Sequence, residues 1–135
     1  MSKIAYDLDG VLVPDCDKLP GVGGLDEFYH LMEFVRPLFQ PKAPYSIITA
    51  RLVTYRSSTE RWINKYLDTA PEVLYHDITD DNAAVYKAKV LNSTPDIQVY
   101  IESDPNIVEF LKQHVNTGCK IFHFSQLTQT NIESL

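Results

Sequence analysis

Two cysteines are all that this 135-residue sequence contains, and no apolar run in it approaches the length of a membrane span. Cys16 and Cys119 lie far apart without the spacing of metal ligands, which disfavours both a secreted disulfide framework and a metal site built on them. The apolar stretch near the N-terminus is interrupted by Asp7 before the core of a signal peptide could form. We therefore expect a cytoplasmic protein with no membrane partner.

Basic residues are also scarce, with 12 Lys and Arg against 18 Asp and Glu and a formal net charge of −6. This balance disfavours a general binder of the nucleic-acid backbone, although it leaves room for a local basic patch. The length and the 44% of hydrophobic residues suit one domain with its own core. We expect this domain over residues 1–124, followed by a polar tail over 125–135. The sequence gives no indication for or against an oligomer.

Short runs rich in Ile, Val, Tyr and Phe alternate with segments of helical spacing, which is typical of βα units around a parallel sheet. Five strands are predicted, over residues 3–7, 45–49, 73–76, 97–102 and 119–124. Four helices are predicted, over 26–36, 55–67, about 81–91 and from Pro105 onward. Asp80 or Asp81 is expected to cap the third helix and Asp104 the fourth. The predicted fold is an α/β three-layer sandwich with a five-stranded, mostly parallel sheet.

The residues at the strand ends are the candidate site residues, because α/β sheets bind ligands beyond the carboxyl ends of their strands. These ends read Asp7-Leu8-Asp9-Gly10-Val11, Thr49-Ala50-Arg51 and Glu102-Ser103-Asp104, and Lys87 lies on the helix before the fourth strand. Two nearby aspartates could hold a divalent cation through oxygen, and one of them could attack a substrate. A threonine hydroxyl and a lysine could bind and neutralise a phosphoryl group. The pattern predicts phosphoryl-transfer chemistry.

In order and spacing, these segments resemble the four motifs of the haloacid dehalogenase (HAD) superfamily. Residues 7–11 are similar to its DxDGV motif I, residues 47–51 to motif II, Tyr86-Lys87 to motif III and residues 99–104 to the acidic motif IV. The resemblance implies a Rossmann-like fold and a Mg²⁺-dependent phosphatase, with Asp7 as nucleophile and Asp9 as acid and then base. It also implies that Thr49 and Lys87 bind the phosphoryl group. The metal ligands would be Asp7, the Asp9 carbonyl and a motif IV acid.

Motif IV departs from the family's pattern, because Ser103 stands where many members have a second acid. Glu102 and Asp104 are both candidate metal ligands. We predict that Glu102 contacts Mg²⁺, directly or through water, since Asp104 is better suited to cap the helix that begins at Pro105. Motif III has its own alternative in Lys89, which points about 200° away from Lys87 on a helix. The aromatic residue before Lys87 favours Lys87.

The candidate substrate-binding residues are Gly10, Ala50, Arg51 and Arg56, although both arginines fit a solvated position at least as well. No cap insertion separates the motifs, and HAD members without a cap act on bulky or macromolecular phosphates. The basic residues after motif II, together with Thr59 and Trp62, look like the phosphatase domain of polynucleotide kinases. We therefore predict that the substrate is a nucleotide or the phosphorylated end of a nucleic acid.

Two other functions are compatible with parts of the sequence. A receiver domain also has five parallel strands, and Asp77 follows the third one, but Lys120 stands at the start of the fifth strand instead of its catalytic end. A HAD-like domain that binds phosphate without turnover is the second alternative, suggested by the irregular motif IV. Hydrolysis of a generic phosphomonoester with and without Mg²⁺ separates this alternative from an enzyme.

Overall fold

The computed structural model of the chain describes residues 4–14, 30–42, 44–76 and 81–127. Five parallel strands form one sheet in the order β3-β2-β1-β4-β5. The strands are β1 (Ile4–Tyr6), β2 (Ser46–Leu52), β3 (Glu72–His76), β4 (Val99–Glu102) and β5 (Lys120–His123). The helices are α2 (Arg56–Tyr66), α3 (Ala83–Ser93) and α4 (Pro105–His114), and 3-10 turns form at η2 (Val53–Tyr55) and η3 (Phe124–Gln126). The predicted α/β class and parallel sheet are confirmed.

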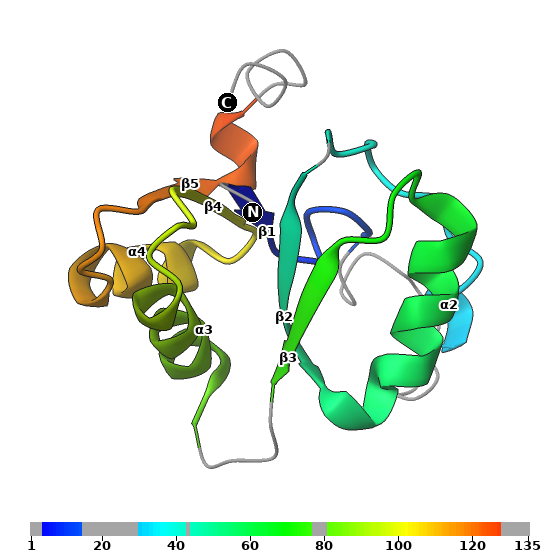
Figure 1. Ribbon diagram of the computed structural model, residues 1–135, viewed down its shortest axis with the longest axis horizontal. Helices are drawn as coiled ribbons and strands as arrows, with labels where there is room; N and C mark the ends of the chain where they lie inside the picture. The colour runs from blue at the N-terminus through cyan, green and yellow to red at the C-terminus, as the bar shows by residue number, and fades with distance from the viewer. Residues whose placement is uncertain (1–3, 15–29, 43, 77–80, 128–135) are drawn as a thin grey trace.

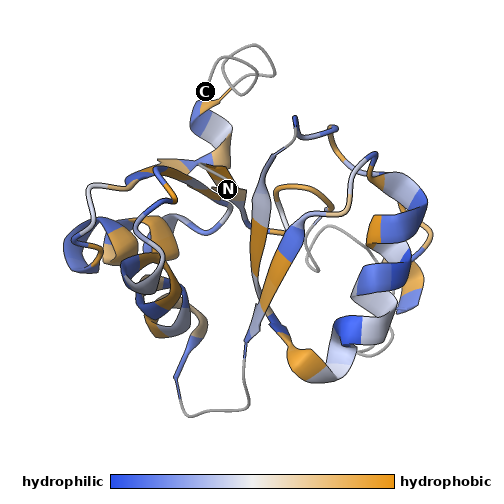
Figure 2. Cartoon of the chain, in the orientation of Figure 1, coloured by the Kyte–Doolittle hydropathy of each residue, from blue (hydrophilic) through white to orange (hydrophobic). Residues whose placement is uncertain are grey.

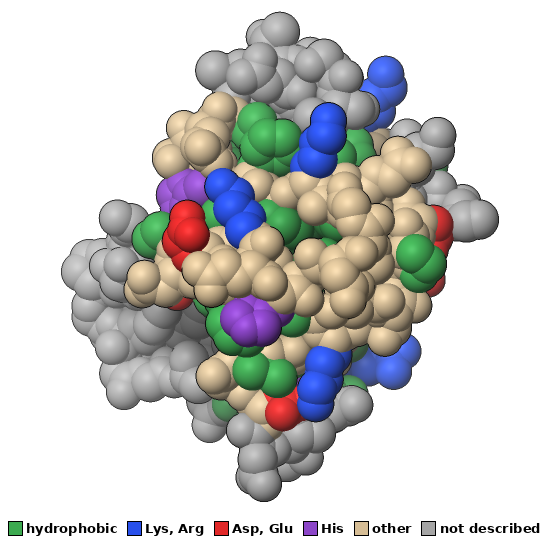
Figure 3. Space-filling model, turned by 90° about the vertical axis from the view of Figure 1, so that its left-hand side faces the viewer, with side chains coloured by type: hydrophobic (Ala, Val, Ile, Leu, Met, Phe, Trp, Pro, Cys, Tyr) green, Lys and Arg blue, Asp and Glu red, His purple; other side chains and the backbone are tan. Residues whose placement is uncertain are grey.

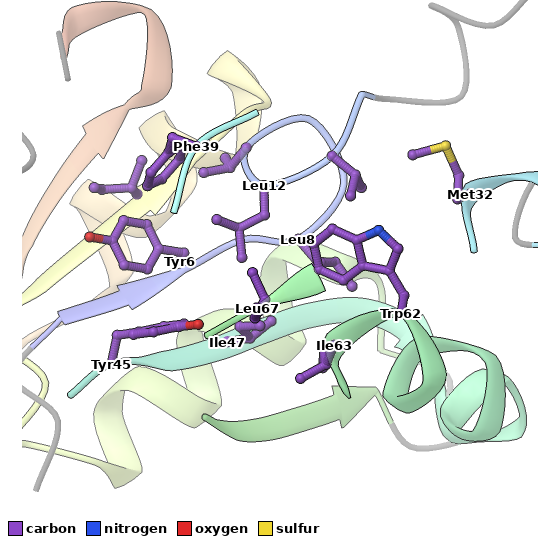
Figure 4. Close-up of a cluster of buried hydrophobic side chains, with 13 residues drawn as sticks. Tyr6, Leu8, Leu12, Met32, Phe39, Tyr45, Ile47, Trp62, Ile63 and Leu67 are labelled. Atoms are coloured by element: carbon purple, nitrogen blue, oxygen red, sulfur yellow. The ribbon is translucent and has the colours of Figure 1, made fainter. Parts of the chain in front are cut away.

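Alternate residues of the central strands point to opposite faces of the sheet and build two cores. Tyr6 and Ile47 pack with Trp62 of α2, whereas Ala5 and Ile48 pack with side chains of α3 and α4. Figure 1 shows α2 on one side of the sheet and α3 and α4 on the other. Figure 4 shows the α2-side core. The strands are apolar on both faces because helices cover both.

The strand order reverses direction at β1. β2 and β3 continue the sheet on one side of β1, and β4 and β5 continue it on the other. Ligand sites of open α/β sheets form at such a switch point, beyond the carboxyl ends of the strands. The residues that follow β1 and β4 are therefore placed side by side where a site is expected.

The predicted first helix, over residues 26–36, ends earlier than expected. Helical geometry within the described residues stops at Met32, and the chain continues in tight turns. The amide of Val35 donates to the Met32 carbonyl at 3.2 Å, and the Val35 carbonyl accepts from Trp62 Nε1 at 2.7 Å. The amides of Glu33 and Phe34 likewise bond to carbonyls three residues back instead of four, so the α-helical pattern is not continued. Residues 26–29 and most of the predicted loop after the first strand lie outside the described residues.

β2 continues three residues beyond its predicted end at Thr49. Its pairing with β3 shifts register between Ile48 and Leu52, so the ladder is irregular at this point. Such irregularities re-aim side chains beside active sites. The residues at this irregularity of β2 include Thr49 and Arg51, and both are buried.

Two further boundaries differ from the prediction. Asn82 caps α3 by accepting a hydrogen bond from the Val85 amide at 2.9 Å, whereas Asp81 is paired with Lys89 and Asp80 lies outside the described residues. Of the residues assigned to the polar tail from 125 onward, Ser125 and Gln126 belong to η3 and Leu127 packs against the α2-side core. Residues 128–135 lie outside the described residues.

The helices carry both hydrophobic and hydrophilic residues along their length, as Figure 2 shows for α2, α3 and α4. This mixture suits helices with one face packed on a sheet and the other in water. In the described part of the chain, no helix has the length and apolar character needed to cross a membrane.

Candidate active site

Asp7 directly follows β1 and opens a tight loop at the switch point of the sheet. Its amide donates to the Ile101 carbonyl of β4 at 2.9 Å, which fixes its backbone between the two central strands. The loop closes on the Leu8 carbonyl, which accepts from the Leu12 amide at 3.0 Å. Gly10 takes a φ of 88°, a conformation that side chains with a Cβ rarely adopt. The turn thus requires the glycine that the sequence placed among the substrate-binding candidates.

The Asp7 carboxylate is held at both of its oxygens and is 5% exposed. Oδ1 accepts from the Leu8 amide at 2.9 Å and lies 3.1 Å from Lys87 Nζ. Oδ2 lies 3.1 Å from Ser103 Oγ. Burial raises the pKa of Asp7 well above its usual value, and the charge of Lys87 offsets part of this rise. A carboxylate with little hydration and one fixed cation has the environment of an activated nucleophile.

Lys87 of α3 lies between two carboxylates and is 2% exposed. Besides its contact with Asp7, its Nζ donates to Glu102 Oε1 at 2.6 Å. Burial alone would lower the pKa of Lys87, but the two carboxylates reverse this effect and raise it, so the amine stays charged. Lys89 lies on an exposed part of the helix and pairs with Asp81 at 2.7 Å. Of the two lysines that the sequence offered, Lys87 is the one beside Asp7.

Glu102 ends β4, and hydrogen-bond donors surround its carboxylate. Its contact with Mg²⁺ stays a prediction. Oε1 accepts from Lys87 and from Tyr100 OH at 2.8 Å, while Oε2 accepts from the amides of Ser103 and Asp104 at 2.9 and 3.1 Å. Burial alone would raise the pKa of Glu102, but the charge of Lys87 and hydrogen bonds with Asp7, Lys87 and the Asp104 amide lower it. The Ser103 hydroxyl is a fifth donor, at 3.4 Å from Oε2, and Glu102 is 1% exposed, so its carboxylate is fixed where it holds Lys87.

Ser103 is the motif IV residue that converges with both aspartates of motif I. Its Oγ lies 3.1 Å from Asp7 Oδ2 and 3.0 Å from the backbone carbonyl oxygen of Asp9. The Ser103 carbonyl oxygen lies 2.8 Å from Nε2 of His123, which ends β5. Sequence reasoning did not select Ser103 or His123. The signal for Ser103 was its position directly after the β4 acid, where an acid was expected and a hydroxyl stands.

Asp104 caps α4, as predicted. Its Oδ1 accepts from the amides of Asn106 and Ile107 at 2.8 and 3.4 Å, and Pro105 occupies the first position of the helix. The cap satisfies backbone donors that have no partner inside the helix.

Replacing Asp104 by alanine is expected to lower the free energy of unfolding by about 0.5 to 2 kcal/mol, the usual cost of a lost N-cap. Urea unfolding measures this loss. Glu109→Ala, at an exposed position of the same helix, is the matched control and should cost less. A cost for Asp104→Ala no larger than that of the control would remove the capping role.

Asp9 is bound by a buried arginine. Arg51 Nε donates to Asp9 Oδ2 at 3.0 Å, and Nη2 donates to Oδ1 at 2.6 Å. The solvated position considered for Arg51 is wrong, because its side chain is 3% exposed. Arg51 Nη1 donates to the hydroxyl of Thr59 in α2 at 3.0 Å. Thr59 was noted in the sequence for its place after motif II, without a role.

The remaining candidates of motif II occupy different environments. Thr49 is fully buried, and its hydroxyl oxygen accepts from the Arg51 amide at 3.1 Å. Ala50 is half-buried between them. Arg56 begins α2 with a side chain that is 61% exposed, pairs with Glu60 at 3.0 Å and lies 6.0 Å from the ring centre of Tyr75. Arg56 therefore fits the solvated interpretation.

The basic residues that cluster in the sequence after motif II have separate acidic or aromatic partners in space. Arg61 pairs with Glu33 at 2.6 Å, and Lys65 Nζ lies 5.2 Å from the ring centre of Phe34. Figure 3 views the side that carries α3 and α4, where the charged side chains are scattered among neutral ones. Arg61 and Lys65 on the α2 side therefore each have a local partner, and the described side chains on the face that Figure 3 shows form no broad basic patch.

No protein-family model matches this chain, and no curated protein matches it. Among solved structures, a chain of the Pnkp1/Rnl/Hen1 RNA repair complex is similar to it, with a TM-score of 0.62 and 14% sequence identity. The likeness covers 90% of this chain and 42% of that chain, so this protein spans less than half the length of its neighbour. At this identity, the likeness shows that the α/β fold is shared.

Proposed function

We propose that this protein is a Mg²⁺-dependent phosphomonoester hydrolase that acts through an aspartyl-phosphate. The observation that carries the proposal is the position of Asp7, whose carboxylate lies at a sheet switch point between the Lys87 ammonium and the Ser103 hydroxyl. Asp9 follows on the same loop, where an acid-base group is needed. The resemblance to the HAD motifs supports the same assignment.

In the proposed reaction, a carboxylate oxygen of Asp7 attacks the phosphorus of the substrate. The ester bond breaks, and the leaving alcohol takes a proton from Asp9. Water then attacks the phosphorus and gives a proton to Asp9, and the bond to Asp7 breaks to release inorganic phosphate. Lys87 stabilises the negative charge of transfer, and the O–H of Thr49 donates to a phosphoryl oxygen.

The residues present fit a divalent cation only if neutral oxygens join the carboxylates. Within the described residues, no three His, Cys, Asp or Glu side chains are grouped to hold a metal. Asp7 Oδ2, the Asp9 carbonyl oxygen and Ser103 Oγ do converge, and Mg²⁺ accepts such oxygens together with waters and substrate phosphate. These three residues would hold the metal. When bound, Mg²⁺ neutralises charge between the carboxylate and the phosphate.

Ser103→Ala is expected to raise the Mg²⁺ concentration for half-maximal activity several-fold, because it removes one oxygen ligand. Ser103→Asp is expected to lower that concentration, because a carboxylate binds a hard cation more strongly than a hydroxyl does. Mg²⁺ titration of activity and direct Mn²⁺ binding measure both variants. If Glu102→Gln weakens metal binding while both Ser103 variants leave it unchanged, the original assignment of Glu102 is correct.

For the substrate, we propose a nucleotide or the phosphorylated end of a nucleic acid. Two observations support this choice: the sequence has no cap insertion between its motifs, and the structural neighbour belongs to an RNA repair complex. Arg56 is exposed beside the motif II segment and can contact a second phosphate. Binding would be local, because the other arginines of the segment are engaged with Asp9 and Glu33.

The deciding experiment measures hydrolysis of p-nitrophenyl phosphate by the purified chain with Mg²⁺ and with a chelator. Metal-dependent turnover supports the enzyme. Binding of phosphate without turnover supports the alternative, a HAD-like domain that binds phosphate but does not hydrolyse the ester. The hydroxyl of Ser103 in place of an acid favours this alternative. A 3′-phosphorylated oligonucleotide, deoxynucleoside monophosphates and glucose 6-phosphate then identify the substrate class. A clear preference for the sugar phosphate would contradict the nucleotide proposal.

A further inference from the structure

Arg51 is a buried guanidinium with donors on two different partners. It belongs to the last part of β2, and Thr59 belongs to the first turn of α2; these segments follow each other along the lower edge of Figure 1. Its Nε and Nη2 donate to the two oxygens of Asp9, and its Nη1 donates to Thr59. The backbone amide of Arg51 is fixed as well, through Thr49.

This geometry restricts Asp9 more than a single bond would. Two parallel N–H···O bonds fix both the direction and the plane of a carboxylate. Thr59 is fully buried, so its hydroxyl anchors the far side of the guanidinium against movement. The carboxylate still has lone pairs beyond those two bonds and can exchange a proton with a leaving alcohol or water.

We infer that Arg51, anchored by Thr59, is a positioning residue that holds Asp9 in place for proton transfer at the Asp7 site. The inference rests on the proposed phosphatase function and gives Arg51 a role other than the substrate binding predicted from sequence. The fork of donors that would grip a phosphate is already placed on Asp9. Proton transfer depends on such placement, because an error of about 1 Å can cost about 10²-fold in rate.

Arg51→Lys tests the inference, since lysine keeps the charge but cannot bind the carboxylate in two parallel bonds. We expect kcat to fall about 10²-fold while KM changes less than about threefold. Thr59→Val should lower kcat by a smaller factor, and Thr59→Ser, which keeps the hydroxyl, should restore most of it. Arg36→Gln is the arginine control at an exposed position and should leave both constants unchanged.

A double variant separates positioning from general structural damage. Arg51→Lys combined with Asp9→Asn should be no slower than Asp9→Asn alone, because the arginine acts through that carboxylate. The inference would be overturned if the rate losses of the two single variants multiplied in the double variant. A raised KM with an unchanged kcat in Arg51→Lys would also overturn it. If Arg51→Lys does not fold, the variants Thr59→Val and Thr59→Ser test the inference alone. An equal kcat for Thr59→Val and the wild type would overturn the inference.

The wild-type measurement keeps the two proposals apart. If the wild type shows no Mg²⁺-dependent hydrolysis, the proposed function fails and the positioning role fails with it. If the wild type is active and the Arg51 and Thr59 variants match it, the positioning role alone fails.

Discussion

Asp7→Asn is expected to lower the rate of phosphomonoester hydrolysis by more than about 10³-fold, which is the scale of loss when a nucleophile is removed. A carboxamide keeps the shape of the side chain and can still contact Leu8 and Ser103, but it cannot form the aspartyl-phosphate. Steady-state hydrolysis measures the loss. Acid quenching with labelled substrate should trap a phosphorylated protein with the wild type and not with the variant.

The control for this prediction is Asp96→Asn, which makes the same chemical change at an exposed position. Its rate should equal that of the wild type. Circular dichroism establishes whether Asp7→Asn is folded, because the change also removes one of the two carboxylates beside Lys87. A folded Asp7→Asn protein that retains the wild-type rate would show that the covalent mechanism is wrong.

The sheet could be predicted because its evidence is local in sequence. Short, nearly continuous apolar runs are expected wherever helices cover both faces of a parallel sheet, and all five runs became strands. The N-cap at Asp104 could also be predicted from neighbouring residues, because an aspartate followed by a proline is favoured where a helix begins. The end of the first helix was predicted at residue 36, whereas hydrogen bonds to the third residue back already replace the helical pattern from Glu33 onward.

Arg51 shows why part of the site could not be predicted. An arginine is rarely fully buried unless it is paired, so the sequence favoured solvent for it. Its partner Asp9 is 42 residues away in the chain, and no spacing rule joins the two positions. The anchor on Thr59 depends on how α2 starts after β2, which the period of apolar residues does not determine.

Motif IV shows a different limit. The sequence identifies Glu102 as an acid at a strand end, and family resemblance directs such an acid to a metal. In the structure, Lys87 enters from α3 as a buried cation, and a buried cation needs a fixed opposite charge. Glu102 and Tyr100 meet this need, and Ser103 takes the place next to Asp7 and Asp9.

Lys87→Met is expected to lower the free energy of unfolding by about 3 to 5 kcal/mol, the usual cost of removing one partner of a buried ion pair. Methionine fills a similar volume but leaves the carboxylates of Asp7 and Glu102 buried without their cation. The Tyr100 hydroxyl and backbone amides remain on Glu102, but they do not replace the charge. Urea unfolding at neutral pH measures the loss.

Lys89→Met is the matched control, because Lys89 makes an ion pair of similar length with Asp81 but has a side chain that is 67% exposed. Exposed pairs contribute about 0 to 1 kcal/mol, so this variant should unfold close to the wild type. Combining Lys87→Met with Glu102→Gln should recover part of the stability, since the second change removes one of the unpaired charges. Equal losses for Lys87→Met and Lys89→Met would mean that the buried charges are hydrated in solution. Glu102 would then not be held by Lys87 in the way the structure shows.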